Sequence, residues 1–521
     1  MTHHDARLLI LVLIPLLGSV AVFSLKEAQG KLAKQISLGV SLVVAVYAIV
    51  VLCQFDTSSK AERFQFNGSW TWIKAFGVHI AFGVDGIAIV LVAMSVVLVP
   101  AVILASWNAL DSRAGAEELN PSGRRRSVKN YFGLILLLEF FMIGVFTATD
   151  VFLFYVFFEA MLVPMYFIIG SFGGPRRQYA AMKFFLYSLV GGLLMLASVI
   201  GLYVTTGSRS FAITDLIGKV PDGPTQKWLF LGFFIAFAIK APLVPFHTWL
   251  PDAGAEAPAG GAALLVGVLD KVGTFGFLRY CLPLFPGASR YFAPLILVLS
   301  VVGILYASFL AIGQRDMKRL VAYTSVAHFG FIGLGIFAFT TQGGTGAVLY
   351  MVNHGFSTGA LFIVVGLLIA RGKSRNVDDY GGAAKVTPIL AGLFLLAGLS
   401  ALALPGMSTF VSEFLVLVGT FTRYKAFAII ATTGIVLAAI YVLYLYQRTF
   451  QGAVNEKVTK FRDLNVREVF SVAPLIALIV FLGVYPKPVL DIINPAVKAT
   501  LSDVHKTDPA PVFKTAVGGK K

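Results

Sequence analysis

The stretch Leu229-Phe-Leu-Gly-Phe-Phe-Ile-Ala-Phe-Ala-Ile-Lys240-Ala-Pro242-Leu-Val-Pro245-Phe-His-Thr-Trp-Leu-Pro-Asp252 decides the fold class of this chain. Lys240 lies within an apolar run, and a lysine at bilayer depth costs about 2.5–3.5 kcal/mol on insertion scales. Pro242 and Pro245 lack a backbone N–H, so they predict a helix break beside the charge. A broken helix next to an ionisable group is typical of ion pathways in membrane transporters.

The composition also predicts a membrane protein. Hydrophobic residues make up 57% of the 521 residues and charged residues 13%, against about 45–50% and 25% in soluble domains. The net charge of +16 comes from basic residues in the short gaps between apolar runs, which indicates membrane topology rather than nucleic-acid binding. Only Cys53 and Cys281 are present, too few to ligate an iron–sulfur cluster. We expect no cofactor and no metal in this chain.

Runs of about 18 or more mostly apolar residues predict transmembrane helices. The first run follows Arg7 and could be a signal peptide, but Leu25-Lys26 is a poor cleavage site. Fourteen candidate spans result, at residues 8–25, 35–53, 82–106, 131–147, 149–169, 180–205, 228–250, 259–281, 293–313, 320–340, 346–370, 387–419, 428–450 and 468–486.

The lysines and arginines between the spans predict an orientation. They are more numerous in the cytoplasmic loops if the N-terminus lies outside, so we expect both termini on the outer face of a multi-pass protein. The lack of a transit peptide favours a bacterial plasma (inner) membrane. Residues 487–521 have little apolar content, so we expect a polar, mostly disordered tail.

The spans show an internal repeat in their interruptions. The run 387–419 is broken at Pro405-Gly406 and carries Glu413, as the run 228–250 carries Lys240 before Pro242. Matching positions of this kind predict two inverted five-helix units in an all-α polytopic protein. We therefore divide the chain into 1–130 (spans 1–3), 131–281 (first repeat), 293–450 (second repeat), 451–486 (span 14) and 487–521 (tail).

Seven ionisable residues fall well inside the spans. Acidic and basic side chains together at this depth suggest a pathway for protons. We expect the Glu159 carboxylate to be the charge partner of Lys240. The pair could instead be an internal ion pair that only fixes helix packing. Asp270 is adjacent to Lys271 and should point to a different face, so we do not pair them, and glycines such as Gly191 and Gly192 are interpreted as close-packing positions. The proposed proton-translocation residues are Glu139, Glu159, Lys240, Lys271, His328, His354 and Glu413.

Longer motifs point to one family. The chain contains Phe-Tyr-Val-Phe-Phe-Glu159-Ala-Met-Leu-Val-Pro164, then the Lys240 stretch quoted above, then Val352-Asn-His354 and Ser412-Glu413-Phe414. It resembles, over nearly its whole length, the subunit M family of proton-translocating NADH-quinone oxidoreductase, respiratory complex I, which includes mitochondrial chain 4.

The resemblance implies a fourteen-helix antiporter-like subunit beside L-type and N-type subunits. It would move protons without its own redox centre, with NADH, FMN, iron–sulfur clusters and quinone in partner subunits. Glu159 and Lys240 would be the acid–lysine pair of the input half, Lys271 the central relay and Glu413 the residue near the exit, with His328 and His354 between them. The family usually continues Pro-Asp-Ala with histidine and threonine, whereas this chain has Gly254 and Ala255.

Three other interpretations stay open at this point. A subunit of a multisubunit sodium/proton antiporter, or the membrane chain of a hydrogenase, would share the fold and much of the Lys240 stretch. A structural spacer between working subunits is a third possibility, although a spacer would gain nothing from seven buried ionisable groups.

Overall fold

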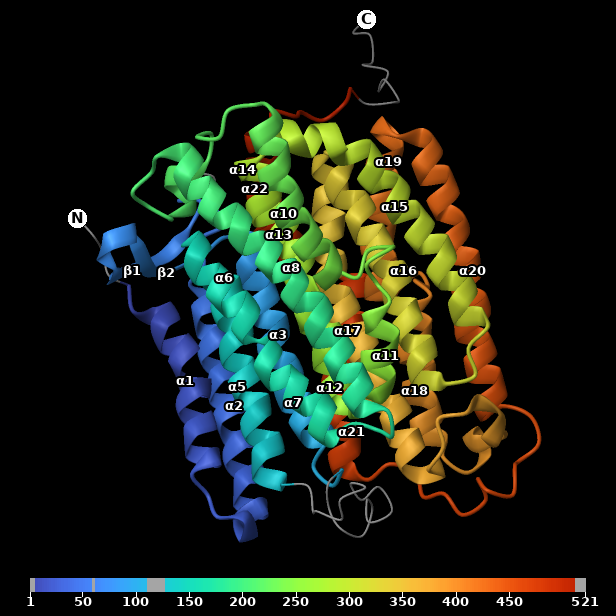
Figure 1. Ribbon diagram of the computed structural model, residues 1–521. Helices are drawn as coiled ribbons and strands as arrows, with labels where there is room; N and C mark the ends of the chain where they lie inside the picture. The colour runs from blue at the N-terminus through green and yellow to red at the C-terminus, as the bar shows by residue number, and fades with distance from the viewer. Residues whose placement is uncertain (1–4, 59–60, 110–126, 511–521) are drawn as a thin grey trace, which may run out of the picture.

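The computed structural model describes residues 5–58, 61–109 and 127–510. Long helices run side by side through the whole molecule (Figure 1). Eleven helices among the described residues are long and apolar enough to cross a membrane, and Arg7–Phe23 and Pro388–Ala401 are shorter apolar helices. The prediction of a mostly helical, polytopic membrane protein is confirmed.

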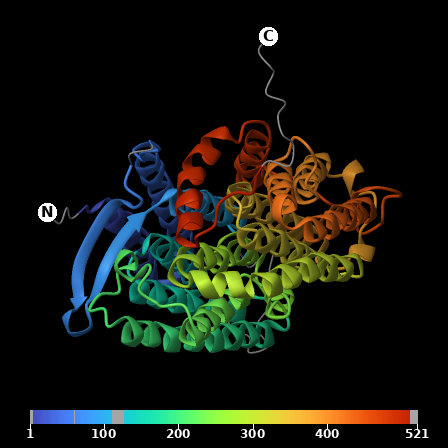
Figure 2. The same cartoon turned by 90° about the horizontal axis from the view of Figure 1, so that it is seen from above.

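The described residues of the N-terminal part, up to Ala105, form helices and one β-hairpin, which packs at the edge of the bundle (Figure 2). The hairpin was not predicted, and it corrects the all-α description and the start of the 82–106 run. Residues 82–84 belong to a strand, and Asp85 caps the following helix by accepting from the N–H groups of Ile87 and Ala88. The elements are α1 (Arg7–Phe23), η1 (Glu27–Gln29), α2 (Gly30–Cys53), β1 (Gln65–Ile73), η2 (Lys74–Phe76), β2 (Val78–Val84) and α3 (Gly86–Ala105), with β1 and β2 antiparallel.

The middle of the chain contains several interrupted helices. The run 228–250 is broken between α10 and α11, whereas single residues, Met161 and Asp270, and the π-helical turns η3 and η4 interrupt the regular pattern of two helices that still run from Val151 to Phe172 and from Ala259 to Leu284. These elements are α5 (Val128–Thr147), α6 (Val151–Ala160), α7 (Leu162–Phe172), α8 (Arg177–Thr206), α9 (Ile213–Leu216), α10 (Pro224–Lys240), α11 (Trp249–Glu256), α12 (Ala259–Leu264), η3 (Leu265–Leu269), α13 (Lys271–Gly276), η4 (Phe277–Cys281) and α14 (Leu282–Leu284).

The last part of the chain has longer helices and one clear break, between α18 and α19. Its elements are α15 (Pro286–Ile312), α16 (Met317–Phe337), α17 (Thr341–Gly372), η5 (Val377–Asp379), η6 (Ala383–Lys385), α18 (Pro388–Ala401), α19 (Ser408–Arg423), α20 (Lys425–Phe450), α21 (Val466–Val484) and α22 (Lys487–Asp503).

Helix α22 corrects the expectation of a disordered tail from residue 487. Its residues Ile493, Val497 and Leu501 recur at helical spacing and are buried, so this segment of mixed polar and apolar residues has one apolar face to pack. That face lies against α3 and α17. Residues 511–521, the end of the predicted tail, lie outside the described part of the chain.

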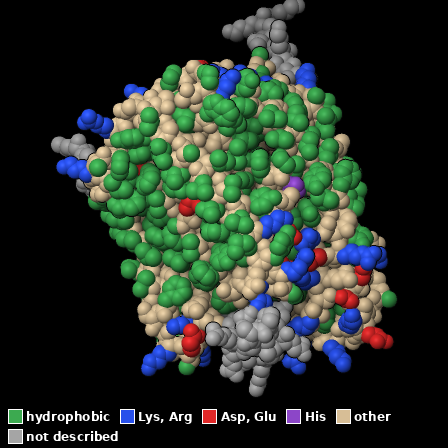
Figure 3. Space-filling model, in the orientation of Figure 1, with side chains coloured by type: hydrophobic (Ala, Val, Ile, Leu, Met, Phe, Trp, Pro, Cys, Tyr) green, Lys and Arg blue, Asp and Glu red, His purple; other side chains and the backbone are tan. Residues whose placement is uncertain are grey.

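The bundle has a buried centre and an apolar outer surface. In the 18-residue apolar stretch within Ala259–Leu284, 100% of the residues are buried; the corresponding shares are 94% in α16 and 89% in α17, but only 33% in the outer helix α20. Hydrophobic side chains cover most of the visible side, while lysines and arginines lie at the two ends and, together with acidic side chains, in a patch on the right at and below half height (Figure 3). An apolar surface of this kind suits a lipid environment, and the charged groups of the central helices are removed from it.

Candidate functional site

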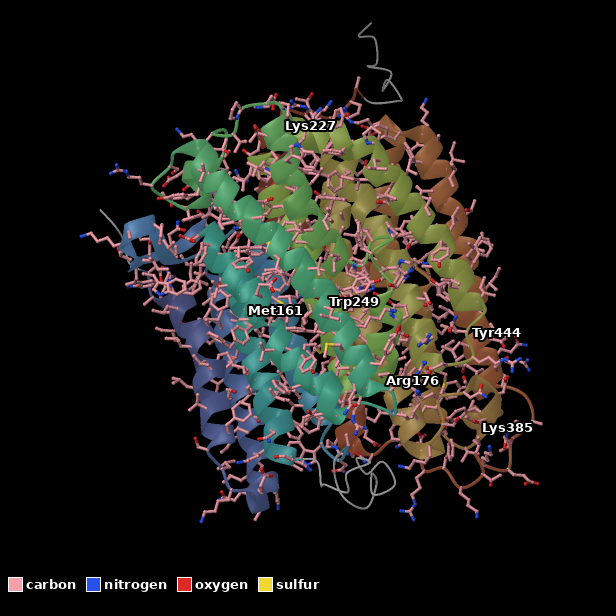
Figure 4. All side chains as sticks on the ribbon, viewed as in Figure 1. Met161, Arg176, Lys227, Trp249, Lys385 and Tyr444 are labelled. Carbon is pink, nitrogen blue, oxygen red and sulfur yellow. The ribbon has the colours of Figure 1, made fainter. Side chains whose placement is uncertain are left out.

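The first half of the site is the break between α10 and α11. Pro242 cannot donate to the Ala238 carbonyl, and Leu243 N–H donates to it instead at 2.9 Å. The next carbonyl, Ile239, accepts from the Trp249 indole at 2.8 Å, so the break leaves these backbone groups satisfied. Met161, the single residue between α6 and α7, and Trp249 both lie near half height of the helices (Figure 4).

Lys240 is the last residue of α10 and is 1% exposed. Its Nζ has no hydrogen-bond partner among the described residues, and it lies 4.8 Å from the centre of the Phe158 ring and 5.7 Å from that of Phe184. Aromatic faces attract a cation but offer it no proton acceptor. The ammonium is thus held without a direct ion pair.

Glu159, the residue after Phe158, interacts electrostatically with Lys240. Its Oε1 also lacks a hydrogen-bond partner within the described residues. The structure therefore brings the predicted pair together at a longer range than a hydrogen bond. A proton can leave Lys240 without first breaking a bonded ion pair.

Glycines on α8 make room for this pair. A Cβ at Gly192 would overlap Glu159 Oε1 and lie 2.9 Å from Oε2, and a Cβ at Gly191 would lie 3.1 Å from the Cα of Ala236 in α10. The two glycines are close-packing positions, as expected. Gly192 also leaves the space that the Glu159 carboxylate occupies, a role that the sequence did not reveal.

The centre of the site is formed by α13 and α17. Lys271 Nζ lies 2.6 Å from His354 Nδ1 and donates to the Val266 carbonyl at 2.5 Å. Both Lys271 and His354 are 0% exposed. A lysine in contact with an imidazole can exchange a proton with it, because one ring nitrogen can accept a hydrogen bond while the other carries a proton.

The second half of the site continues from His354 to Glu413. The rings of His328 and His354 are 5.3 Å apart, and those of His328 and Tyr350 are 5.6 Å apart. Tyr350 donates to Glu413 Oε2 at 2.8 Å. Polar groups therefore follow one another from Lys271 to Glu413 through the buried helices α16 and α17 and the buried face of α19.

The second helix break contributes to this half. Helix α18 ends at Ala401, whose carbonyl lies 3.0 Å from His328 Nε2, and helix ends leave such carbonyls without an intrahelical partner. The chain then passes Pro405 and Gly406, where Gly406 has a φ of 92°, before α19 presents Glu413. Only glycine takes up this backbone conformation without steric cost.

One predicted residue, Glu139, does not join this arrangement. Glu139 in α5 is 0% exposed, but both of its carboxylate oxygens lack a partner and no charged residue of the described chain interacts with it.

Two groups near the site, Tyr350 and Asp270, were not predicted as site residues from the sequence. Tyr350 was left out because a census of charged side chains omits phenols, and Asp270 was set aside because it neighbours Lys271.

Comparisons with known proteins identify the family of this chain. Residues 148–438 match the family described as NADH:quinone oxidoreductase/Mrp antiporter, TM. NADH-quinone oxidoreductase subunit M of Mycobacterium tuberculosis is 50% identical over 527 residues, which cover 96% of this chain and 95% of that protein.

Solved structures with the same fold belong to membrane complexes. A chain of respiratory complex I from Thermus thermophilus matches with a TM-score of 0.84 at 30% identity and covers 95% of this chain and 99% of that one. A chain of the Mrp complex from Dietzia sp. matches with a TM-score of 0.83 at 19% identity, covering 97% and 100%, and shows the shared fold alone. The family predicted from the motifs is confirmed. The chain belongs to the subunit M family of NADH-quinone oxidoreductase, the proton-translocating membrane subunits of respiratory complex I.

Proposed function

We propose that protons cross this subunit along a line of buried groups in the order Glu159, Lys240, Lys271, His354, His328 and Glu413. The observation that carries the proposal is the contact chain from Lys271 through His354 to the bonded pair of Tyr350 and Glu413. Buried ionisable groups are costly in a membrane protein and mark ion pathways. Glu139 stays a prediction from the sequence alone.

The charge on Glu159 controls the first step in this proposal. An ionised carboxylate stabilises the Lys240 ammonium, and moving or protonating that carboxylate favours the neutral amine. The released proton would then reach Lys271 and the histidines. The break at Pro242 and Pro245 supports this role, because it places the charge at a helix end rather than inside a regular helix.

We also propose that the chain crosses the membrane fourteen times as two inverted repeats, 131–281 and 293–450. The two broken helix pairs, α10–α11 and α18–α19, support this arrangement. Each pair carries one residue of the site, because Lys240 ends α10 and Glu413 lies in α19. Helices broken in this way are individually short. This is one reason why fewer than fourteen of the described helices are individually long enough to cross a membrane.

The assembly is proposed from the family. The subunit would lie beside L-type and N-type antiporter-like subunits in a bacterial plasma membrane, with both termini on the outer face. NADH, FMN, iron–sulfur clusters and quinone would be bound by partner subunits. The identity of chains that co-purify with this one tests the assignment, because an Mrp-type antiporter would lack NADH-oxidising partners.

The Lys240→Ala variant tests the proton line in the assembled complex. We expect NADH-driven proton uptake by inverted membrane vesicles to fall about tenfold or more, since a positioned proton-transfer group contributes about a hundredfold or more. Lys227→Ala is the matched control. Lys227 is on the same helix, at its upper end (Figure 4), with Nζ 3.4 Å from the centre of the Tyr291 ring.

NADH oxidation by a water-soluble electron acceptor would report the amount of assembled complex in both variants. Wild-type pumping by assembled Lys240→Ala would contradict the proposed line. Glu159→Gln should also slow pumping, because the amide cannot stabilise the ammonium as a carboxylate does.

A further inference from the structure

Asp270 is a buried acid that the proton line does not use. It is 0% exposed, and neither carboxylate oxygen has a hydrogen-bond partner among the described residues. A buried carboxylate without hydrogen bonds is costly unless a nearby cation compensates its charge. The surroundings of Asp270 therefore need to supply that cation.

Backbone packing places Asp270 on the side of Lys240. Residues three apart lie on one face of a helix, so Asp270 shares a face with Gly273. A Cβ at Gly273 would lie 2.5 Å from the backbone N of Ala241 and 2.5 Å from the Phe237 carbonyl oxygen. That face of α13 thus touches the end of α10, next to Lys240.

The neighbouring face of α13 points to α17. Lys271 lies 2.6 Å from His354, and Thr274, three residues later, donates to Met351 Sδ at 2.7 Å. Asp270 and Lys271 point to different faces, as the sequence predicted. Asp270 is thus next to Lys271 in the chain and shares the helix face that packs beside Lys240.

The electrostatics agree with this placement. Among the described residues, the charged groups that interact with Asp270 are Lys271 and Lys240. Lys240 in turn interacts with both Glu159 and Asp270. Acid and base therefore alternate from Glu159 through Lys240 and Asp270 to Lys271.

We propose that Asp270 is the shared counter-ion of Lys240 and Lys271 and that it couples proton loss at the first lysine to proton gain at the second. The inference rests on the proposed function. Before the step the three groups are one ammonium, one carboxylate and one neutral amine. After the proton has moved from Lys240 Nζ to Lys271 Nζ they are again one of each.

The physical advantage is that the buried triad stays neutral overall. Glu159 also acts on Lys240, but Asp270 is the acid that acts on Lys271, so without Asp270 the transfer would leave an uncompensated positive charge on Lys271, and buried unpaired charges are strongly disfavoured. One carboxylate beside two lysines avoids this cost whichever lysine holds the proton. Asp270 thus acts through the two lysines, because its carboxylate stabilises the ammonium group of whichever lysine holds the proton.

Asp270→Asn in the assembled complex tests the proposal. Loss of the anion should lower NADH-driven pumping several-fold at alkaline pH and move the alkaline limb of the pH profile down by about one pH unit or more, the size of effect that a nearby charge has on titration. Pumping should recover at lower pH. Asp270→Glu, which keeps the charge, should retain the wild-type profile.

Two further variants keep the test decisive. Asp270→Leu also removes the charge and suits a site without hydrogen bonds, so it serves if the Asn variant does not assemble. Thr274→Val perturbs the same helix without changing charge and should leave the profile unchanged. A shifted profile in the charge-removing variants alone supports the shared counter-ion.

The outcomes separate this inference from the proposed function. If assembled Asp270→Asn or Asp270→Leu keeps the wild-type pH profile while Lys240→Ala and Lys271→Ala fail to pump, the counter-ion role is overturned and the proton line stands. If the lysine variants also pump normally, the proton line itself falls. Lower activity at every pH without a shift would also overturn the counter-ion role.

Discussion

Gly192→Ala is the most direct test of where the Glu159 carboxylate lies. A Cβ at position 192 would overlap Glu159 Oε1 and lie 2.9 Å from Oε2. The carboxylate must therefore move by more than about 1 Å, and a misplacement of that size can cost about a hundredfold in rate. We expect assembled Gly192→Ala to pump at least about tenfold more slowly, through displacement of the carboxylate that acts on Lys240.

The assay is NADH-driven acidification of inverted vesicles, followed with a pH-sensitive dye and normalised to the amount of assembled complex. Gly201→Ala is the matched control on the same helix. Its Cβ would meet only the end of the flexible Leu229 side chain, at 2.6 Å from Cδ2, so this variant should pump like the wild type.

A second substitution shows whether the effect acts through Glu159. Glu159→Asp shortens the side chain by one methylene and withdraws it from the new Cβ, so the double variant should pump faster than Gly192→Ala alone. Coupling of this kind is expected for residues in contact and absent for independent sites. Wild-type pumping by Gly192→Ala, or simple additivity of the two changes, would refute the reasoning.

Two other substitutions test the second half of the site and the scaffold. Tyr350→Phe removes the 2.8 Å hydrogen bond to Glu413, worth about 1 kcal/mol or more, so we expect slower pumping with normal assembly; unchanged proton uptake would argue against this link. Arg279→Ala leaves Asp85, its ion-pair partner at 2.6 Å, buried and uncompensated at a cost of about 3–5 kcal/mol. We expect little assembled complex on native gels, and wild-type abundance would contradict the importance of the pair.

Much of the site could be predicted because its signals are local in the chain. Pro242 and Pro245 break a helix wherever they occur, since they lack a donor. Lys240 is expensive at bilayer depth in any packing arrangement. Asp270 and Tyr350 could not be assigned to the site in this way, because their roles depend on interactions with residues of other helices.

The fold shows the same division. Apolar runs predicted the helices, whereas the hairpin β1–β2 and helix α22 were missed because both are partly polar segments that become ordered by packing. For α22, the buried positions Ile493, Val497 and Leu501 are too few to stand out by hydropathy. They become visible as a face only when α3 and α17 lie beside them.

The sequence by itself determined that this is a membrane protein with two broken helices and a set of buried acids, lysines and histidines, because composition and proline chemistry act residue by residue. Only the tertiary structure decided which of those groups meet. Lys271 lies 83 positions from His354 in the chain and 2.6 Å from it in space. Such distances depend on how closely helices pack, and small residues such as Gly192 and Gly273 set that closeness through contacts that no local pattern encodes.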